Sequence, residues 1–121
     1  MKITNLVLWV ADATLSYKFY KKLGFDVGEV NECNAIVSCS GFEIQLVTMR
    51  DEVEFNGDSL ASQKGLGMYV RINVEDVDKK YLGVKALGFA TSSEPRDWDW
   101  GAREFVLKDL DGYKICFWSN I

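Results

Sequence analysis

The chain repeats itself once, and this internal repeat limits its fold more than any other feature. The segment LWVAD (residues 8–12) leads into a stretch that ends in KLGF (22–25), and INVED (72–76) leads into one that ends in ALGF (86–89). Each copy has the pattern of a strand, an aspartate that caps a helix, about three helical turns and a glycine that ends the helix. The chain therefore consists of two copies of one structural unit.

Three predicted strands follow each predicted helix. In the first half these are residues 25–30, 34–39 and 42–47, and in the second half 89–91, 102–108 and 113–118. The helices present apolar stripes, with Leu15, Phe19 and Leu23 in the first and Val77, Tyr81, Val84 and Leu87 in the second. We therefore predict an α+β fold of two tandem βαβββ modules that form a curved mixed sheet, with the helices on one face and an open cleft on the other. The modules (1–49 and 66–121) form a single domain (1–121), joined by a polar linker (50–65).

Composition excludes several classes of protein. A net charge of −4 without a basic stripe argues against nucleic acid as a partner. No apolar run approaches the roughly 20 residues of a membrane span, and strand-like sequence begins at once after Met1, so we expect no signal peptide. Three cysteines without a CxxC motif indicate reduced thiols. We therefore expect a cytoplasmic protein.

Alternation along the predicted strands separates two faces. One parity is wholly apolar and is the predicted core: Leu6, Leu8, Val10, Phe42, Ile44, Leu46, Met68, Val70, Ile72, Val74, Phe105, Leu107, Ile115 and Phe117. The other parity mixes aromatic, charged and amide side chains: Asn5, Val7, Trp9, Glu43, Gln45, Val47, Tyr69, Arg71, Asn73, Glu104, Val106, Lys108, Lys114, Cys116 and Trp118. Such a mixture suits a partly wet ligand cleft, although a dimer interface is also rich in Trp, Tyr and Arg.

Several motifs in order resemble the vicinal oxygen chelate superfamily, which contains glyoxalase I, extradiol dioxygenases and bleomycin-resistance proteins. They are Val10-Ala11-Asp12, Ser16, Phe19-Tyr20, Leu23-Gly24-Phe25, Trp100-Gly101-Ala102-Arg103-Glu104-Phe105 and Asp109-Leu110-Asp111-Gly112-Tyr113. The stretch from Trp100 to Gly112 looks most like the bleomycin-resistance branch. The resemblance implies a homodimer whose clefts draw on both chains.

The resemblance also implies where metal-dependent members would carry their ligands. Those positions fall on Asn5, Gln45, Tyr69 and Cys116, whereas the family's ligands are mostly His and Glu, and this chain has no histidine. Two amides, a phenol and a thiol offer one good donor for a transition metal. We therefore expect no metal and no cofactor, which makes glyoxalase or dioxygenase chemistry improbable.

The expected ligand-binding residues are Trp9, Glu43, Gln45, Tyr69, Arg71, Trp98, Trp100, Glu104, Cys116 and Trp118. Cys116 is either a nucleophile or, more simply, a buried thiol without a chemical role. We consider three roles for Glu43 and Glu104. They act as general bases, form ion pairs with Arg71, Lys108 or Lys114, or attract a cationic ligand. Trp98 and Trp100 either form a stacking flap or cap the edge of the core. The tryptophans, with Tyr69, would form an aromatic box.

The leading functional hypothesis is a metal-independent small-molecule-binding protein of the bleomycin-resistance type, which holds a planar or cationic, antibiotic-like compound in an aromatic cleft. A metal-free acid–base isomerase or lyase of the same fold is the first alternative. A non-catalytic dimeric interaction module is the second.

Overall fold

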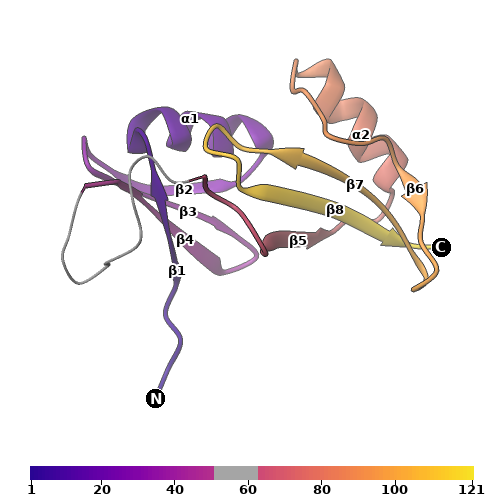
Figure 1. Ribbon diagram of the computed structural model, residues 1–121, viewed down its shortest axis with the longest axis horizontal. Helices are drawn as coiled ribbons and strands as arrows, with labels where there is room; N and C mark the ends of the chain where they lie inside the picture. The colour runs from indigo at the N-terminus through magenta and orange to yellow at the C-terminus, as the bar shows by residue number, and fades with distance from the viewer. Residues whose placement is uncertain (51–62) are drawn as a thin grey trace. The chain divides into compact units, whose positions relative to one another are not determined.

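The computed structural model describes residues 1–50 and 63–121. Contacts along the chain divide it into two compact units, Met1–Ser62 and Gln63–Ile121. Each unit is a four-stranded sheet with one helix (Figure 1). Most of the predicted linker (50–65) lies outside the described residues.

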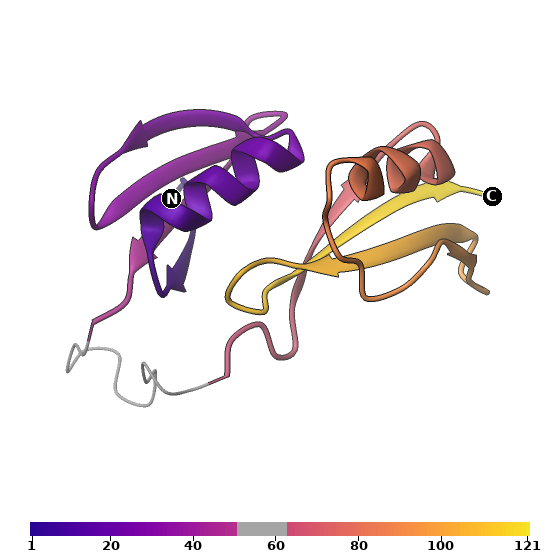
Figure 2. The ribbon, with the colours of Figure 1, turned by 90° about the horizontal axis from the view of Figure 1, so that it is seen from above.

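The first unit contains β1 (Leu6–Val10), α1 (Ala13–Leu23), β2 (Asp26–Val30), β3 (Asn34–Cys39) and β4 (Phe42–Thr48). Its strands lie in the order β1-β4-β3-β2, with β1 and β4 parallel and the other neighbours antiparallel. The helix α1 runs along one face of this sheet (Figure 2).

The second unit contains β5 (Tyr69–Asn73), α2 (Val77–Ala86), β6 (Arg96–Asp97), β7 (Ala102–Lys108) and β8 (Lys114–Asn120). Its order, β5-β8-β7-β6, and its single parallel pair, β5 with β8, repeat those of the first unit. The α+β fold of two tandem βαβββ modules is therefore confirmed, as two four-stranded mixed sheets.

One predicted strand is wrong. Residues 89–91 are not a strand, and the position is taken by the two-residue β6. The chain approaches β7 earlier only through isolated bonds, one from the Ser92 N–H to the Val106 carbonyl and one from the Val106 N–H to Ser93 Oγ. Regular pairing begins after Pro95, where Arg96 lies opposite Glu104.

The predicted helix caps are present in both modules. The carboxylate of Asp12 accepts a hydrogen bond from the Leu15 N–H at 3.0 Å, and that of Asp76 accepts one from the Lys79 N–H at 3.0 Å. Gly24 ends α1 in the left-handed conformation, with φ of 112°. Both helices therefore begin where the repeat predicts, and α1 ends at its predicted glycine, whereas α2 ends at Ala86 with Leu87 as a right-handed C-cap.

The predicted apolar stripe of α1 is partly wrong. Leu23 is buried, but Leu15 is exposed, and Ser16 and Tyr20 are buried instead. The Tyr20 ring packs edge-on against Phe25 at a centroid distance of 5.1 Å. This contact places the Ser16–Tyr20 side of the helix, rather than the Leu15 side, against the sheet.

The stripe of α2 is shorter than predicted. Val77 and Val84 are buried, and Tyr81 packs edge-on against Phe105 with centroids 5.2 Å apart. Leu87 is exposed because it caps the helix beyond its last turn.

The apolar strand parity lies on the helix side of each sheet. Its buried members are Leu8, Val10, Ile44, Leu46, Phe105, Leu107, Ile115 and Phe117. Phe42 is exposed at the start of β4, and Met68, Val70, Ile72 and Val74 are only half-buried. The reason is that α2 packs on β7 and β8 rather than on β5. Among the described helices, none has the length and apolar character needed to cross a membrane.

Candidate functional site

The face of the second sheet opposite α2 gathers most of the predicted ligand-binding residues. Side chains of Phe105 and Phe117 point to the helix side, where their rings stack with centroids 5.3 Å apart. Their neighbours along the strands, Glu104 and Cys116, therefore point to the other face. Strand register places Arg71 beside Cys116 and Glu104 beside Trp118.

Glu104 is the centre of this face. Its Oε1 accepts hydrogen bonds from Arg71 Nη2 at 2.6 Å and from the Trp100 indole N–H at 3.1 Å. Its Oε2 accepts one from the Cys116 thiol at 3.3 Å. The Glu104 side chain is only 8 % exposed, so this buried carboxylate is held by three donors from three separate segments.

Aromatic rings and guanidinium groups surround Glu104. The guanidinium of Arg71 lies 4.1 Å from the centroid of the Trp118 ring, and that of Arg96 lies 3.5 Å from the centroid of Trp98. The rings of Trp98 and Trp100 stack at 4.5 Å with an interplanar angle of 14°. Arg96, Trp98 and Trp100 therefore form one continuous stack that is attached to Glu104 through the indole N–H of Trp100.

The electrostatics keep Glu104 ionised. Burial opposes its charge, but the hydrogen bonds from Arg71, Trp100 and Cys116 outweigh burial, and the net effect lowers the pKa of the Glu104 carboxyl. The pKa of the Cys116 thiol shifts in the opposite direction. Burial and the neighbouring carboxylate raise the pKa of Cys116 to about 12.

These shifts decide between the chemical roles considered from the sequence. A thiol with a pKa of about 12 stays protonated at neutral pH, so Cys116 has the character of a buried donor rather than of a nucleophile. A general base near neutral pH needs a raised carboxyl pKa, and Glu104 has the reverse. Glu104 is therefore a fixed anchor that orients Arg71 and Trp100.

The first sheet carries the remaining predicted residues on its face opposite α1. Asn5 donates a hydrogen bond from Nδ2 to Gln45 Oε1 at 2.9 Å, which joins the segment before β1 to β4. Trp9 and Glu43 are half-buried on the same face. In the described ranges 1–50 and 63–121, Glu43 has no ion-pair partner.

The four positions that correspond to family metal ligands do not fit a metal. Asn5 and Gln45 use their amides on each other, and Cys116 carries a protonated thiol that donates to Glu104. Tyr69 lies two positions before Arg71 on β5, on the same face. No group of three His, Cys, Asp or Glu side chains with metal-binding geometry occurs in the described residues. Three of the four positions are therefore occupied by bonds within the protein, and the fourth, Tyr69, offers a phenol, which is a poor ligand for a divalent transition metal.

Two arginines that shape this part of the structure were not predicted from the sequence. Arg96 caps the tryptophan stack, and Arg103 joins three elements by binding Asp78 of α2 at 3.0 Å and Asp97 of β6 at 3.1 Å. Arg103 thereby holds the segment that carries Trp98 and Trp100 from the helix side. A signal for Arg96 existed in the sequence, because it follows the only proline and precedes the tryptophans.

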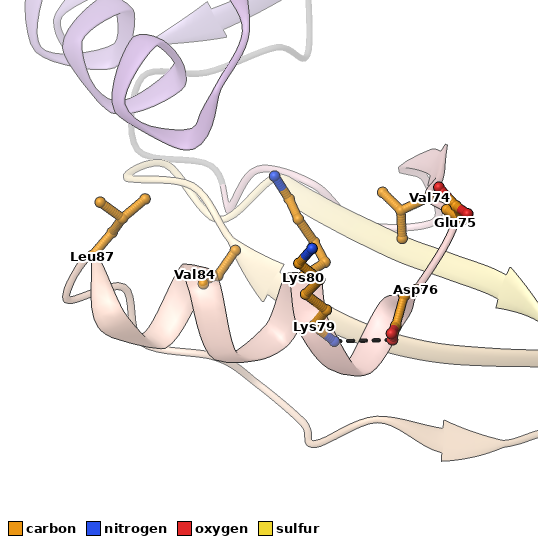
Figure 3. A pocket seen from close by; sticks show the side chains of 8 residues that line it. Val74, Glu75, Asp76, Lys79, Lys80, Val84 and Leu87 are labelled. Carbon is orange, nitrogen blue, oxygen red and sulfur yellow. Dashed lines mark hydrogen bonds between the residues drawn. The ribbon is translucent and has the colours of Figure 1, made fainter.

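A groove of about 570 Å³ is lined by α2 and by the segment just before it, residues 74–76 (Figure 3), and Glu104 is not among its lining residues. Val74, Val84 and Leu87 supply its apolar lining, and Lys80 reaches toward it over the Phe117 ring. The Asp76 carboxylate beside it is already bound to the N–H of Lys79 (Figure 3). The volume suits a small ligand, and four charged residues, Glu75, Asp76, Lys79 and Lys80, line the groove beside its apolar surface.

Several solved structures of other proteins share this fold. A protein from Nocardioides described as a glyoxalase/bleomycin resistance protein/dioxygenase is 24% identical, with TM-score 0.82 over 100% of this chain and 84% of that one. A hypothetical protein from S. aureus is 24% identical, with TM-score 0.80 over 98% and 94%. Lactoylglutathione lyase from Agrobacterium tumefaciens is 16% identical, with TM-score 0.73 over 98% and 92%. No curated protein matches the sequence at a significant level.

The sequence itself gives the assignment. The profile of one family, described as the Glyoxalase/Bleomycin resistance protein/Dioxygenase superfamily, matches residues 2–117. This match covers both modules and all the motifs from Val10 to Gly112. The chain therefore belongs to the glyoxalase/bleomycin resistance protein/dioxygenase superfamily.

Proposed function

We propose that this protein is a metal-independent small-molecule-binding protein of the bleomycin-resistance type, which holds a planar ligand against Trp100. The observation that supports this most is the state of the Trp100 ring. Trp98 covers one face and Glu104 fixes the indole N–H, yet the residue is 58 % exposed. Its uncovered surface is a stacking platform that is already oriented before a ligand arrives.

The geometry favours a planar ligand over a cationic one. A cation-binding box needs open ring faces, but Arg71 lies over Trp118 and Arg96 lies over Trp98. The one carboxylate in this cluster, Glu104, is paired with Arg71. The protein's own guanidinium groups thus occupy the places that a ligand cation would take, while the open surface of Trp100 accepts an uncharged aromatic ring.

The affinity expected for such a site is sufficient for a protein that binds a small molecule without catalysing a reaction. Stacking on one aromatic side chain contributes about 1–3 kcal/mol in proteins that bind flat bases. Micromolar affinity corresponds to about −8 kcal/mol, so the remainder would come from apolar burial on this face and from polar contacts. Val106 and Trp118 offer half-buried apolar surface beside the cluster.

The alternatives gain less support. The enzyme hypothesis needs a desolvated carboxylate without a basic partner, and Glu104 is bonded to Arg71. Glu43 has no ion-pair partner among the described residues, but it is only half-buried, so it is not the desolvated carboxylate that this hypothesis needs. The homodimer and the cytoplasmic location remain predictions from the resemblance and the composition.

Replacement of Trp100 by alanine is expected to weaken binding of a planar aromatic probe by about tenfold or more, because the platform is lost. The measurement is isothermal titration of naphthalene derivatives into wild type and Trp100→Ala. Leu82→Ala is the matched control, since Leu82 is an exposed apolar side chain on α2, outside the cluster. Equal affinities for all three proteins, or no heat with any probe, would contradict the proposed function.

A further inference from the structure

A second row of polar side chains crosses the same face of the second sheet, next to the Glu104 cluster. Register pairs Tyr69 of β5 with Lys114 of β8, and Lys114 with Lys108 of β7. Paired residues of neighbouring strands project from the same face, so the phenol and the two ammonium groups lie on one side. This row adjoins the row that contains Arg71 and Cys116, at a spacing of about 7 Å along the strands.

This row carries positive charge that the described part of the chain does not neutralise. Like charges directly opposite on neighbouring strands are destabilising, yet Lys108 and Lys114 face each other. Lys114 donates to the Gly65 carbonyl at 3.1 Å, and neither lysine has an acidic partner in residues 1–50 or 63–121. Asp109, the adjacent acidic residue in sequence, directs its Oδ1 to the backbone N–H groups of Asp111 and Tyr113.

Arg71 extends the same positive surface toward the ligand platform. Its Nη2 donates to Glu104 and its guanidinium also interacts with the Cys116 sulfur, yet the Arg71 side chain is 36 % exposed and open to a further acceptor. The Trp118 ring beneath holds the guanidinium plane in place. A carboxylate or phosphate near Tyr69 and Lys114 would receive hydrogen bonds from a preoriented guanidinium edge, a phenol and an ammonium group.

We propose that the ligand of this site is a planar aromatic acid, whose anionic oxygen group is held by Tyr69, Arg71 and Lys114 while its ring stacks on Trp100. The inference rests on the proposed function, because it assigns the chemistry of the ligand at the same site. The anionic group would neutralise the opposed lysines, and Glu104, already paired with Arg71, would repel it little.

Three probes of one shape separate the two proposals: naphthalene-2-carboxylate, its uncharged carboxamide, and the ammonium compound naphthalene-2-methanamine. The carboxylate is expected to bind about tenfold more tightly than the carboxamide and more tightly still than the amine. A fourth probe, 2-naphthyl phosphate, distinguishes the two anionic groups, and the tighter of the two names the group that fits.

The variant Lys114→Met keeps the aliphatic stem and removes the charge. It should weaken the carboxylate about five- to tenfold and change carboxamide binding by less than about twofold. Lys85→Met, on the exposed surface of α2, is the control and should change neither. Thermal unfolding of both variants verifies that they are folded.

The anionic assignment and the proposed planar site predict different results in these titrations. If carboxamide and amine bind as tightly as the carboxylate, the anionic assignment is wrong while the planar site stands. A carboxylate preference that survives in Lys114→Met removes that lysine from the site and overturns the assignment as stated. If no probe binds, the proposed function and the inference fall together.

Discussion

Replacement of Arg71 by methionine is expected to lower the free energy of unfolding by about 2 kcal/mol at pH 7. The variant keeps an apolar stem over Trp118 but leaves the Glu104 carboxylate, which is 8 % exposed, without its charged partner. Removing one member of a buried ion pair costs about 3–5 kcal/mol. The estimate here is lower because the Arg71 side chain is 36 % exposed and water can partly replace it.

The same substitution should change the dependence of stability on pH. In the wild type, the bonds to Arg71 and its neighbours lower the pKa of Glu104 in the folded state, so their stabilisation is present above the carboxyl's unfolded pKa of about 4. It is lost as the pH falls through the folded-state value. The difference between wild type and Arg71→Met should therefore shrink in acid, because a protonated Glu104 needs no guanidinium.

The double variant Arg71→Met/Glu104→Gln provides the control, measured by urea unfolding at pH 7 and at pH 3. An uncharged amide leaves no buried charge, so the double variant should recover most of the stability that Arg71→Met loses at pH 7. A loss that is equal at both pH values, and that Glu104→Gln does not relieve, would place the role of Arg71 in packing on Trp118 alone.

Replacement of Gly65 by alanine is expected to cost at least about 3 kcal/mol of unfolding free energy. Gly65 has φ of +77°, and a Cβ there would overlap the Gly112 carbonyl oxygen and lie 2.9 Å from its carbonyl carbon. Two costs therefore add: about 1–2 kcal/mol for a left-handed non-glycine residue, and the displacement of backbone in the turn between β7 and β8. The Lys114 contact with the Gly65 carbonyl would be disturbed as well.

Gly67 offers a matched control in the same segment. Its φ is +73°, but an added Cβ would meet nothing within 4 Å. Gly67→Ala should therefore cost only about 1–2 kcal/mol, the backbone part alone. Chemical denaturation of both variants measures the difference. Equal losses would contradict the close approach of Gly65 to Gly112.

The repeat made the fold predictable. Each copy of the pattern carries its own helix cap, and Asp12 and Asp76 do cap the helices. The alternation of apolar and polar residues predicted the buried face correctly in the strands that a helix covers. It overstated burial at Val70 and Ile72, because α2 packs on β7 and β8, a tertiary choice that no strand pattern contains.

The chemistry of the site was less accessible to sequence reasoning. Parity placed Glu104, Arg71 and Cys116 on one face, but pairing depends on side-chain direction and register. The sequence could not indicate that both arginines would lie over tryptophan rings, Arg71 over Trp118 and Arg96 over Trp98. Under the proposed function, that contact narrows the predicted ligand from a planar or cationic compound to a planar one, since Arg71 and Arg96 occupy ring faces that a ligand cation would need.

The central claim is that a planar ligand stacks on Trp100 beside Glu104. The indole N–H resonances of the four tryptophans in a ¹H–¹⁵N correlation spectrum test it most directly during titration with naphthalene-2-carboxylate. The Trp100 signal, assigned through its loss in Trp100→Ala, should move furthest, with Trp98 next. A titration that leaves the Trp100 signal in place while the ligand binds elsewhere would contradict this account.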